Sequence, residues 1–298
     1  FFTEPVRDFA NEGLRDHFRD AVASATVPNI ASDKTPEDAA EAVRIAHNFF
    51  PTWRDTPVAK RSDCLVRAAD LMRKQRDALA AVMVKEAGKT WREADADVCE
   101  AIDFCEFYAR CAPSLFERHR LGKFIGELDE HWHEPRGVCA VISPWNFPLA
   151  IACGMTVAAL VTGNTTILKP AEQTTGIARI LVDILYEAGV PREALHFLPA
   201  PGETTGAALV RDERVAVICF TGSKAVGLDI IKAAGVTPDT QPFVKQVVCE
   251  MGGKNAVIAM ADADSEAVVA SVLNGAFGST GQRCTATSRL LLHQDIAP

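Results

Sequence analysis

The sequence has no long apolar segment. No uninterrupted apolar run approaches the roughly 18 residues that suggest a membrane-spanning helix, so we expect no such helix. The start, residues 1–20, alternates acidic and basic side chains and lacks the apolar core of a signal peptide. The sequence therefore predicts a cytoplasmic protein.

Closely spaced cysteine pairs are also absent. The nine cysteines are scattered and odd in number, and none belongs to a Cys-x-x-Cys pair. Disulfide frameworks and zinc sites of the usual spacing are therefore not indicated, and we expect no metal. A reducing compartment fits this pattern.

Basic residues are fewer than acidic ones. The chain has 31 Lys and Arg residues against 39 Asp and Glu residues, a net charge of −8. Nucleic acids and anionic membranes attract basic surfaces, so we expect neither as a partner. Of the 298 residues, 48% are hydrophobic, which provides for a substantial core. At roughly 150 residues per domain, the length suggests about two domains.

The first third of the chain has helical patterns. Thr35-Pro36-Glu37-Asp38 looks like a helix start, with a hydroxyl N-cap, proline at the first position and acids in the first turn. Further helices are predicted at about 58–84 and 90–111. Acids alternate with alanines over 93–97, which predicts a solvated face at the start of the last helix.

From Gly137 onward, short β-rich runs alternate with helical patterns. Strands are predicted at 138–142, 165–168, 195–198 and 215–220, and helices at about 149–161, 175–188, 203–210 and 223–234. This alternation predicts an α/β fold with a Rossmann-type parallel sheet that has helices on both faces. Ligands bind such sheets beyond the carboxyl ends of the strands. Polar loops follow all four predicted strands: Ser143-Pro144-Trp145-Asn146, Lys169-Pro170-Ala171-Glu172, Ala200-Pro201-Gly202 and Thr221-Gly222-Ser223.

Cys284 is the first candidate for chemistry. It follows a polar loop, 278–283, that contains two glycines, so its thiol is expected to be accessible. Arg283 could favour the thiolate, or it could face solvent. A lone cysteine is most often a small buried hydrophobe, so the loop by itself leaves both interpretations open. We interpret the other eight cysteines as packing residues.

Glu250 and Asn146 are the other two candidates. Glu250 ends an apolar run and precedes two glycines, where a turn-capping acid is the simpler interpretation. Together with Cys284, it suggests a nucleophile and a base that activates water. Asn146 lies between Pro144 and Pro148; its amide could stabilise an oxyanion, although a turn asparagine is the ordinary interpretation.

Signals for a phosphate-binding loop are weak. The dinucleotide fingerprint Gly-x-Gly-x-x-Gly is absent. Gly202-x-x-x-Gly206 and Gly222-Ser223 could open helices towards a pyrophosphate. His131 and His133 lack an evident third metal ligand, so we expect an exposed strand there.

Five motifs, taken in order, resemble the NAD(P)-dependent aldehyde dehydrogenase superfamily. Glu250 precedes Cys284 by 34 residues, and this separation is also similar to the one in that family. Residues 3–9, 84–97 and 101–104 resemble its L-glutamate γ-semialdehyde (1-pyrroline-5-carboxylate) dehydrogenase branch, which oxidises the semialdehyde to glutamate in proline degradation. The five motifs are Ser143–Pro148, Gly163–Glu172, Phe220–Ser223, Glu250–Lys254 and Gly281–Cys284.

The resemblance implies a mechanism. Cys284 would be the nucleophile that forms a thiohemiacetal with the aldehyde. The Asn146 side chain and the Cys284 backbone N–H would hold the oxyanion. Hydride transfer to the cofactor would leave a thioester, and Glu250 would activate the water that hydrolyses it.

The resemblance also implies NAD as the cofactor. Lys169 and Glu172 match residues at the adenine ribose, and a carboxylate there would repel a 2′-phosphate, which favours NAD over NADP. The remaining positions implied for the cofactor are Ser143, Trp145, Gly202, Gly206, Thr221, Gly222 and Ser223.

Domain organisation and partners follow from the same resemblance. Residues 1–249 would form the NAD-binding domain with N-terminal helices, and 250–298 the beginning of a second, α/β catalytic domain. Relatives have additional residues near position 28–32 and continue past Pro298. The complete protein is expected to be a homo-oligomer, either alone or fused to or associated with proline dehydrogenase.

Three alternatives to glutamate semialdehyde oxidation stay open. The first is another hydrolytic aldehyde dehydrogenase with a different substrate. The second is a CoA-acylating or phosphate-reductase relative, which would not need a base at Glu250. The third is an inactive NAD-binding fragment.

Overall fold

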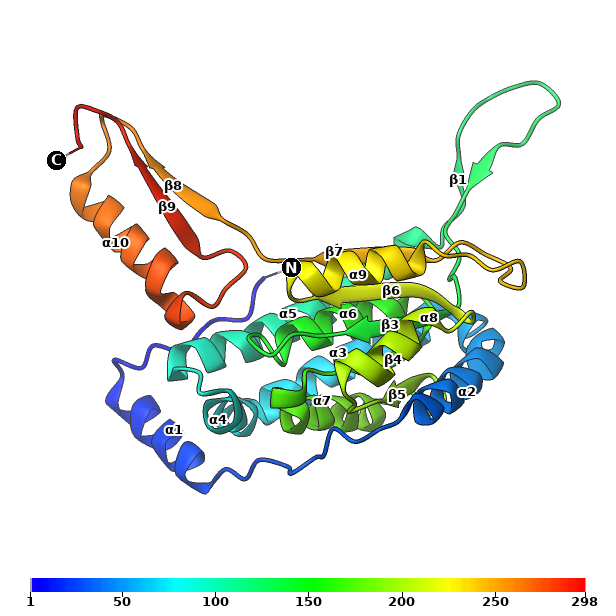
Figure 1. The fold of residues 1–298 in the computed structure, drawn as a ribbon, viewed down its shortest axis with the longest axis horizontal. Helices are drawn as coiled ribbons and strands as arrows, with labels where there is room; N and C mark the ends of the chain where they lie inside the picture. Colours follow the sequence, from blue (N-terminus) through cyan, green and yellow to red (C-terminus); the bar gives the residue numbers. More distant parts are fainter. Residues whose placement is uncertain (1, 298) are drawn as a thin grey trace.

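A five-stranded parallel sheet forms the centre of the chain. The computed structural model describes residues 2–297, and the sheet has the strand order β5-β4-β3-β6-β7 (Figure 1). The strands predicted between 138 and 220 are confirmed. The strands are β3 (Val138–Ile142), β4 (Thr165–Lys169), β5 (Leu195–Phe197), β6 (Val215–Thr221) and β7 (Gln246–Glu250).

Helices cover both faces of this sheet, which confirms the predicted fold class. Along β3, Val138 and Ala140 belong to one buried core, while Cys139 and Val141 belong to another. Successive side chains of a strand point to opposite faces, so these cores lie on opposite sides of the sheet. Helices α2 (Pro36–Arg54), α8 (Ala207–Arg211) and α9 (Lys224–Ala234) cover one face, and α6 (Ala150–Val161) and α7 (Thr175–Glu187) cover the other.

Four more helices precede the sheet in the sequence. They are α1 (Glu12–Ser24), α3 (Val58–Lys74), α4 (Arg76–Ala87) and α5 (Trp91–Leu115). The single helix predicted at 58–84 is wrong, because the chain breaks at Gln75, where φ is −103° and ψ is 12°. Neither glycine nor proline marks this break, and apolar periodicity runs through it.

The start of α2 follows the sequence closely. The Thr35 hydroxyl accepts a hydrogen bond from the Asp38 N–H at 3.3 Å, and the Asp38 carboxylate accepts one from the Thr35 N–H at 2.9 Å. These reciprocal bonds form a capping box, which satisfies backbone N–H groups at the helix start.

The predicted solvated face at the start of α5 is wrong. The side chains of Asp95 and Asp97 are 1% and 0% exposed, and both are ion-paired. The Arg76 guanidinium donates to both Asp95 oxygens at 2.7 Å, and Lys89 Nζ lies 2.8 Å from Asp97. The paired cations offset the free-energy cost of burying these carboxylates. The alternation of acids with alanines along α5 does not reveal such partners, because they come from other segments of the chain.

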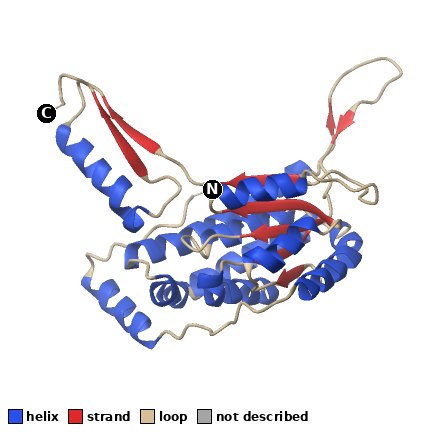
Figure 2. Cartoon of the chain, in the orientation of Figure 1, coloured by secondary structure: helices blue, strands red, loops and turns tan. Residues whose placement is uncertain are grey.

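Two segments extend away from the sheet and its helices (Figure 2). One is an antiparallel hairpin of β1 (His119–Arg120) and β2 (Glu130–His131), where His131 and His133 are exposed as expected. The other comprises β8 (Asn255–Ala259), α10 (Ser265–Phe277) and β9 (Thr287–Leu292), in which α10 connects two parallel strands. We call this second segment the C-terminal unit.

The cysteines are only partly packing residues. Cys64, Cys99, Cys105, Cys139 and Cys153 are buried, and Cys219 and Cys249 are half-buried. Cys111 is exposed, so its interpretation as a packing residue is wrong. Its six-residue spacing from Cys105 turns it to another side of α5.

No helix among residues 2–297 is both long enough and apolar enough to cross a bilayer. In the same part of the chain, no three His, Cys, Asp or Glu side chains are grouped closely enough to hold a metal ion.

The Asp95 environment yields a prediction about stability. Asp95→Ala leaves the buried Arg76 guanidinium without its carboxylate, so we expect a loss of about 3–5 kcal/mol in the free energy of unfolding. Asp183→Ala breaks an exposed pair with Arg179 on α7 and should cost less than about 1 kcal/mol. Urea denaturation of both variants measures the difference, and equal losses would contradict the structural role of Asp95.

Candidate active site

The residues predicted at the adenine ribose lie together. Lys169, at the end of β4, is buried, and its Nζ donates to Glu172 Oε1 at 3.1 Å. The same carboxylate oxygen accepts a hydrogen bond from the Gly202 N–H at 2.8 Å. The loops after β4 and β5 therefore meet at Glu172. Its side chain is 45% exposed, so it is open to a ligand at this edge of the sheet.

A π-helical turn, Gly202–Gly206, follows this contact and leads into α8. The Gly206 N–H donates to the Pro201 carbonyl at 3.0 Å. Gly206 therefore lies inside the turn, and Gly202 at its exposed start.

The ends of β6 and β7 place two further predicted residues, Thr221 and Gly222, next to Glu250, and Ser223 follows them. Thr221 and Glu250 are paired in register, and the Gly222 N–H donates to the Glu250 carbonyl at 3.1 Å. Ser223 caps α9, because its hydroxyl accepts from the Val226 N–H at 3.4 Å. The Glu250 side chain is exposed.

The loop after β3 carries Ser143, Trp145 and Asn146. The Ser143 N–H donates to the Lys169 carbonyl at 3.1 Å, which connects this loop to the end of β4. Trp145 is exposed, while the Asn146 side-chain amide donates to the Gln282 carbonyl at 2.8 Å. Asn146 and the loop that leads to Cys284 are therefore in direct contact.

A buried ion pair supports the backbone of Asn146. Lys89 Nζ donates to the Asn146 carbonyl at 2.8 Å and lies 2.8 Å from Asp97. Asp97 in turn accepts a hydrogen bond from the Ala150 N–H, at the start of α6. Burial raises the pKa of Asp97, although Lys89 and the N–H groups of Leu149 and Ala150 oppose the rise.

The loop before Cys284 has an unusual backbone. Ser279, Thr280 and Gly281 all have positive φ, at 50°, 54° and 74°. Glycine adopts this region readily, but serine and threonine do not. Cys284 itself is exposed, as the polar loop predicts.

Glu93, in the first turn of α5, binds this loop. Its Oε1 accepts hydrogen bonds from the Ser279 N–H at 2.6 Å, the Ser279 hydroxyl at 2.9 Å and the Arg283 guanidinium at 3.0 Å. Burial works to raise the pKa of Glu93, but the bonds from Ser279 and Thr90 and the charge of Arg283 lower it overall. Arg283 is thus paired with a carboxylate.

The segment after Glu250 touches the nucleophile candidate through its backbone. Asn255 Nδ2 donates to the Cys284 carbonyl at 2.7 Å. A Cβ atom at Gly253 would lie 2.6 Å from that same oxygen. Gly253, the second glycine of the Glu250–Lys254 motif, therefore allows the close approach of this segment to the Cys284 carbonyl. Only residues 251–253 separate Glu250 from Lys254.

Four residues of this site went unnoticed as site candidates in the sequence. Glu93, Lys89 and Asp97 lie in the segment 84–97, which resembles the 1-pyrroline-5-carboxylate dehydrogenase branch but belongs to none of the five family motifs. Asn255 directly follows the motif Glu250–Lys254. Their contacts with the loops of the site join positions that are 29 to 190 residues apart in the sequence. The available signal is the cluster of acids at 93–97, but its alternation with alanines predicts a solvated face.

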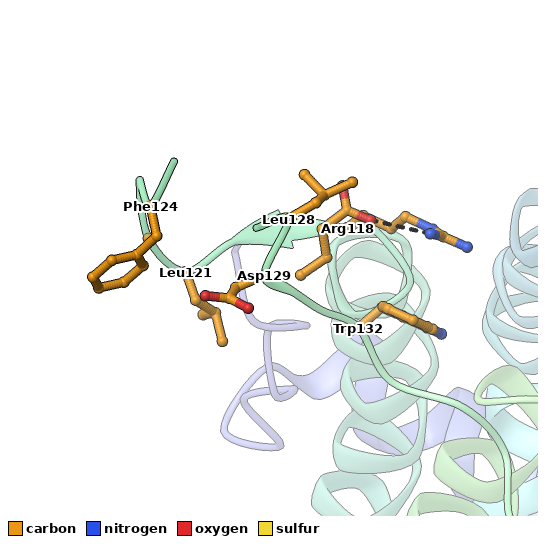
Figure 3. A pocket seen from close by; sticks show the side chains of 8 residues that line it. Arg118, Leu121, Phe124, Leu128, Asp129 and Trp132 are labelled. Carbon is orange, nitrogen blue, oxygen red and sulfur yellow. Dashed lines mark hydrogen bonds and ion pairs between the residues drawn. The ribbon is translucent and has the colours of Figure 1, made fainter. Parts of the chain in front are cut away.

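Two surface concavities lie away from these residues. One, of about 600 Å³, is formed by the β1–β2 hairpin and its loop, where Leu121, Leu128 and Trp132 surround it (Figure 3). The other, of about 540 Å³, lies at the end of α7. Neither is lined by a predicted site residue, so the candidate site is the loop edge of the sheet.

Comparison with known proteins identifies the family. Residues 20–298 match the sequence model of the aldehyde dehydrogenase family. The chain belongs to this family. The family resemblance of the five motifs is therefore confirmed, and the candidate residues lie on the strand ends and loops of an aldehyde dehydrogenase fold.

Curated relatives in this aldehyde dehydrogenase family carry the name of the predicted branch. The chain is 42% identical to 1-pyrroline-5-carboxylate dehydrogenase 2 of Halalkalibacterium halodurans over 270 residues, 91% of this chain and 52% of that one. It is also 42% identical to the Bacillus subtilis 1-pyrroline-5-carboxylate dehydrogenase over 266 residues, 89% and 52% of the two chains. The chain thus spans about half the length of these relatives.

Solved structures give the same picture. A 1-pyrroline-5-carboxylate dehydrogenase from Thermus with bound NAD matches with a TM-score of 0.92 at 38% identity, covering 99% of this chain and 64% of that one. Proline utilization A from Bdellovibrio bacteriovorus matches with a TM-score of 0.93 at 39% identity, covering 99% and 34%.

The contact at Gly253 yields a prediction with a neighbouring control. In Gly253→Ala the new methyl group meets the Cys284 carbonyl and the Asn255 amide, so the opening free energy of β9 should fall by about 1–3 kcal/mol. A Cβ at Gly252 has no neighbour within 4 Å, and Gly252→Ala should change this value by less than about 0.5 kcal/mol. Hydrogen exchange of amides 287–292 measures both, and equal exchange rates would be evidence against the close approach.

Proposed function

We propose that the protein to which this chain belongs oxidises L-glutamate γ-semialdehyde to L-glutamate with NAD. The observation that carries the proposal is the 42% identity to relatives named 1-pyrroline-5-carboxylate dehydrogenase, over nearly the whole chain. The positions of Cys284, Asn146 and Glu250 support it, because the first two lie on loops in direct contact and the third lies three residues before Gly253.

Covalent catalysis starts at Cys284. Its thiolate sulfur bonds to the aldehyde carbon, and the carbonyl electron pair moves to oxygen, giving a thiohemiacetal oxyanion. A primary amide has two N–H donors. Asn146 directs one of them at the Gln282 carbonyl, and the second serves the oxyanion together with the Cys284 backbone N–H.

Bound NAD supplies the acceptor for the hydride that leaves the substrate carbon, and the carbonyl re-forms as a thioester on Cys284. Glu250 then takes a proton from water, whose oxygen attacks the thioester carbon. The carbon–sulfur bond breaks, the thiolate of Cys284 leaves, and glutamate is released. This hydrolytic step distinguishes the proposal from a CoA-acylating reaction.

The residues at the edge of the sheet fit a dinucleotide. The exposed carboxylate of Glu172, fixed by Lys169 and Gly202, can accept hydrogen bonds from ribose hydroxyls. Gly222 and Ser223 precede α9, and the N–H groups at the start of a helix attract phosphate. Ser143, Trp145, Gly206 and Thr221 complete the proposed cofactor residues.

The wider organisation is part of the same proposal. We assign residues 1–249 to the NAD-binding domain and 250–298 to the start of an incomplete catalytic domain. The relatives' greater length supports this, as do exposed apolar side chains in the C-terminal unit such as Val269, Leu273 and Phe277. We further propose a cytoplasmic homo-oligomer, and a matching proline utilization A, described as bifunctional, supports an association with proline dehydrogenase.

The roles of Cys284 and Glu250 can be separated by kinetics of the complete protein. Cys284→Ala should lower NADH formation from glutamate semialdehyde by at least about 10³-fold, because no covalent adduct forms. Glu250→Gln should give a burst of about one NADH per active site and then stop, because the thioester is not hydrolysed. Stopped-flow absorbance of NADH records both.

Cys111→Ala, which removes the other exposed thiol, is the matched control and should leave the rate unchanged. A requirement for CoA would favour the acylating alternative. Faster oxidation of simple aliphatic aldehydes than of glutamate semialdehyde would favour a different substrate. NAD binding without turnover by the 298-residue chain would favour the inactive NAD-binding fragment.

Cofactor choice depends on the charge of Glu172. Glu172→Gln removes the carboxylate that repels a 2′-phosphate, so we expect the preference for NAD over NADP to fall by about tenfold or more. The ratio of kcat/KM values for the two cofactors measures this. Glu203→Gln, at a nearby exposed glutamate, should leave the ratio unchanged, and equal shifts in both variants would show a general charge effect instead.

A further inference from the structure

The loop before Cys284 holds a conformation that its own side chains disfavour. Ser279 and Thr280 lie in the left-handed region, with φ of 50° and 54°. Non-glycine residues keep such angles only where surrounding contacts impose them. Contacts outside the loop must therefore hold it.

Glu93 supplies those contacts. Its Oε1 accepts three hydrogen bonds from the loop, two from Ser279 and one from Arg283. Arg283 also donates to the Ser279 hydroxyl at 2.9 Å, so the two ends of the loop are joined around one carboxylate. We call this set of bonds the Glu93 cluster.

The base of the Glu93 cluster is fixed. Glu93 is the third residue of α5, and its N–H donates to the Thr90 hydroxyl that caps this helix. Its side chain is only 15% exposed. The strained loop is thus attached to a helix end that packs against the main core.

The loop leads directly to the proposed oxyanion site. Gln282, between Ser279 and Cys284, accepts the hydrogen bond from the Asn146 amide. Release of Ser279 would let the loop relax towards negative φ, which would shift the Gln282 carbonyl and the Cys284 backbone away from Asn146.

We propose that Glu93 is a positioning residue that holds the 279–283 loop against Asn146 and thereby fixes the position of Cys284. The consequence of this positioning for catalysis rests on the proposed function, whereas the effect of Glu93 on the loop does not. The Glu93 side chain has no contact with the Cys284 thiol or with the Asn146 amide, and it acts through Ser279 and Arg283.

Hydrogen exchange tests the effect on the loop. Glu93→Gln should speed exchange of amides 279–284 by about tenfold or more, because hydrogen bonds to a charged acceptor are lost or weakened. Ser279→Ala, which removes only hydroxyl bonds, should give a smaller increase in the same amides. Glu187→Gln, at the exposed last residue of α7, is the matched control and should leave them unchanged.

The buried thiols distinguish loop release from general unfolding. Cys105 and Cys153 are buried and should stay protected from alkylation in Glu93→Gln. If these thiols are alkylated as fast as in urea, the Glu93→Gln variant has unfolded. The exchange of amides 279–284 in Ser279→Ala then tests the proposal instead. Unchanged exchange at 279–284 in a folded Glu93→Gln variant would overturn the proposal.

Kinetics of the complete protein test the catalytic consequence. Glu93→Gln should lower kcat by about tenfold or more while KM for NAD stays within about twofold, because the cofactor residues are untouched. A raised KM for NAD with unchanged kcat would overturn the positioning role. If wild-type protein does not oxidise glutamate semialdehyde, the proposed function fails, and the exchange result still decides whether Glu93 holds the loop.

Discussion

The pairing of one half-buried and two buried carboxylates at the start of α5 is the interaction on which the site depends. Within five residues, Glu93, Asp95 and Asp97 each bind a different part of the chain. Asp95 holds Arg76 and the Arg7 N–H, Asp97 holds Lys89 and the start of α6, and Glu93 holds the loop before Cys284. Because unpaired buried charges are costly, these partners are constrained together, and one helix end organises segments that are distant in sequence.

The sheet supplies the second constraint. Its strands run parallel and are buried on both faces, so their polar loops meet at a single edge. This explains why Lys169, Glu172 and Gly202 are in contact, although Lys169 ends β4, Glu172 lies in the segment after β4 and Gly202 lies after β5. The residues proposed for the cofactor are held by neighbouring strands, whereas the loop before Cys284 is held by the Glu93 side chain of α5.

Local patterns were enough to predict much of this architecture. The strands from Val138 to Thr221 and the cap at Thr35 follow from short-range composition, because the alternation of β-rich and helical runs and the capping residues are local signals. The exposure of Cys284 follows from its polar loop. Family motifs indicated the candidate residues, and the match over residues 20–298 confirms the family.

Features that depend on distant partners could not be predicted in this way. Asp95 and Asp97 alternate with alanines as solvated residues do, and only Arg76 and Lys89 show that they are buried. The break at Gln75 has no helix-breaking residue, and the exposure of Cys111 depends on how α5 packs. Likewise, the left-handed backbone of Ser279 and Thr280 is imposed by Glu93, 186 positions away from Ser279.

The placement of the C-terminal unit has a mechanical consequence. Glu250 belongs to the last strand of the main sheet, whereas Cys284 belongs to a β–α–β unit that stands apart from it (Figure 1). The proposed base and nucleophile are therefore linked twice, through the chain segment 251–254 and through the hydrogen bonds that Glu93 and Asn146 make with residues 279–283. These two links close a ring of contacts that runs from β7 through the C-terminal unit to α5, so the separation of the two groups is restrained from both sides.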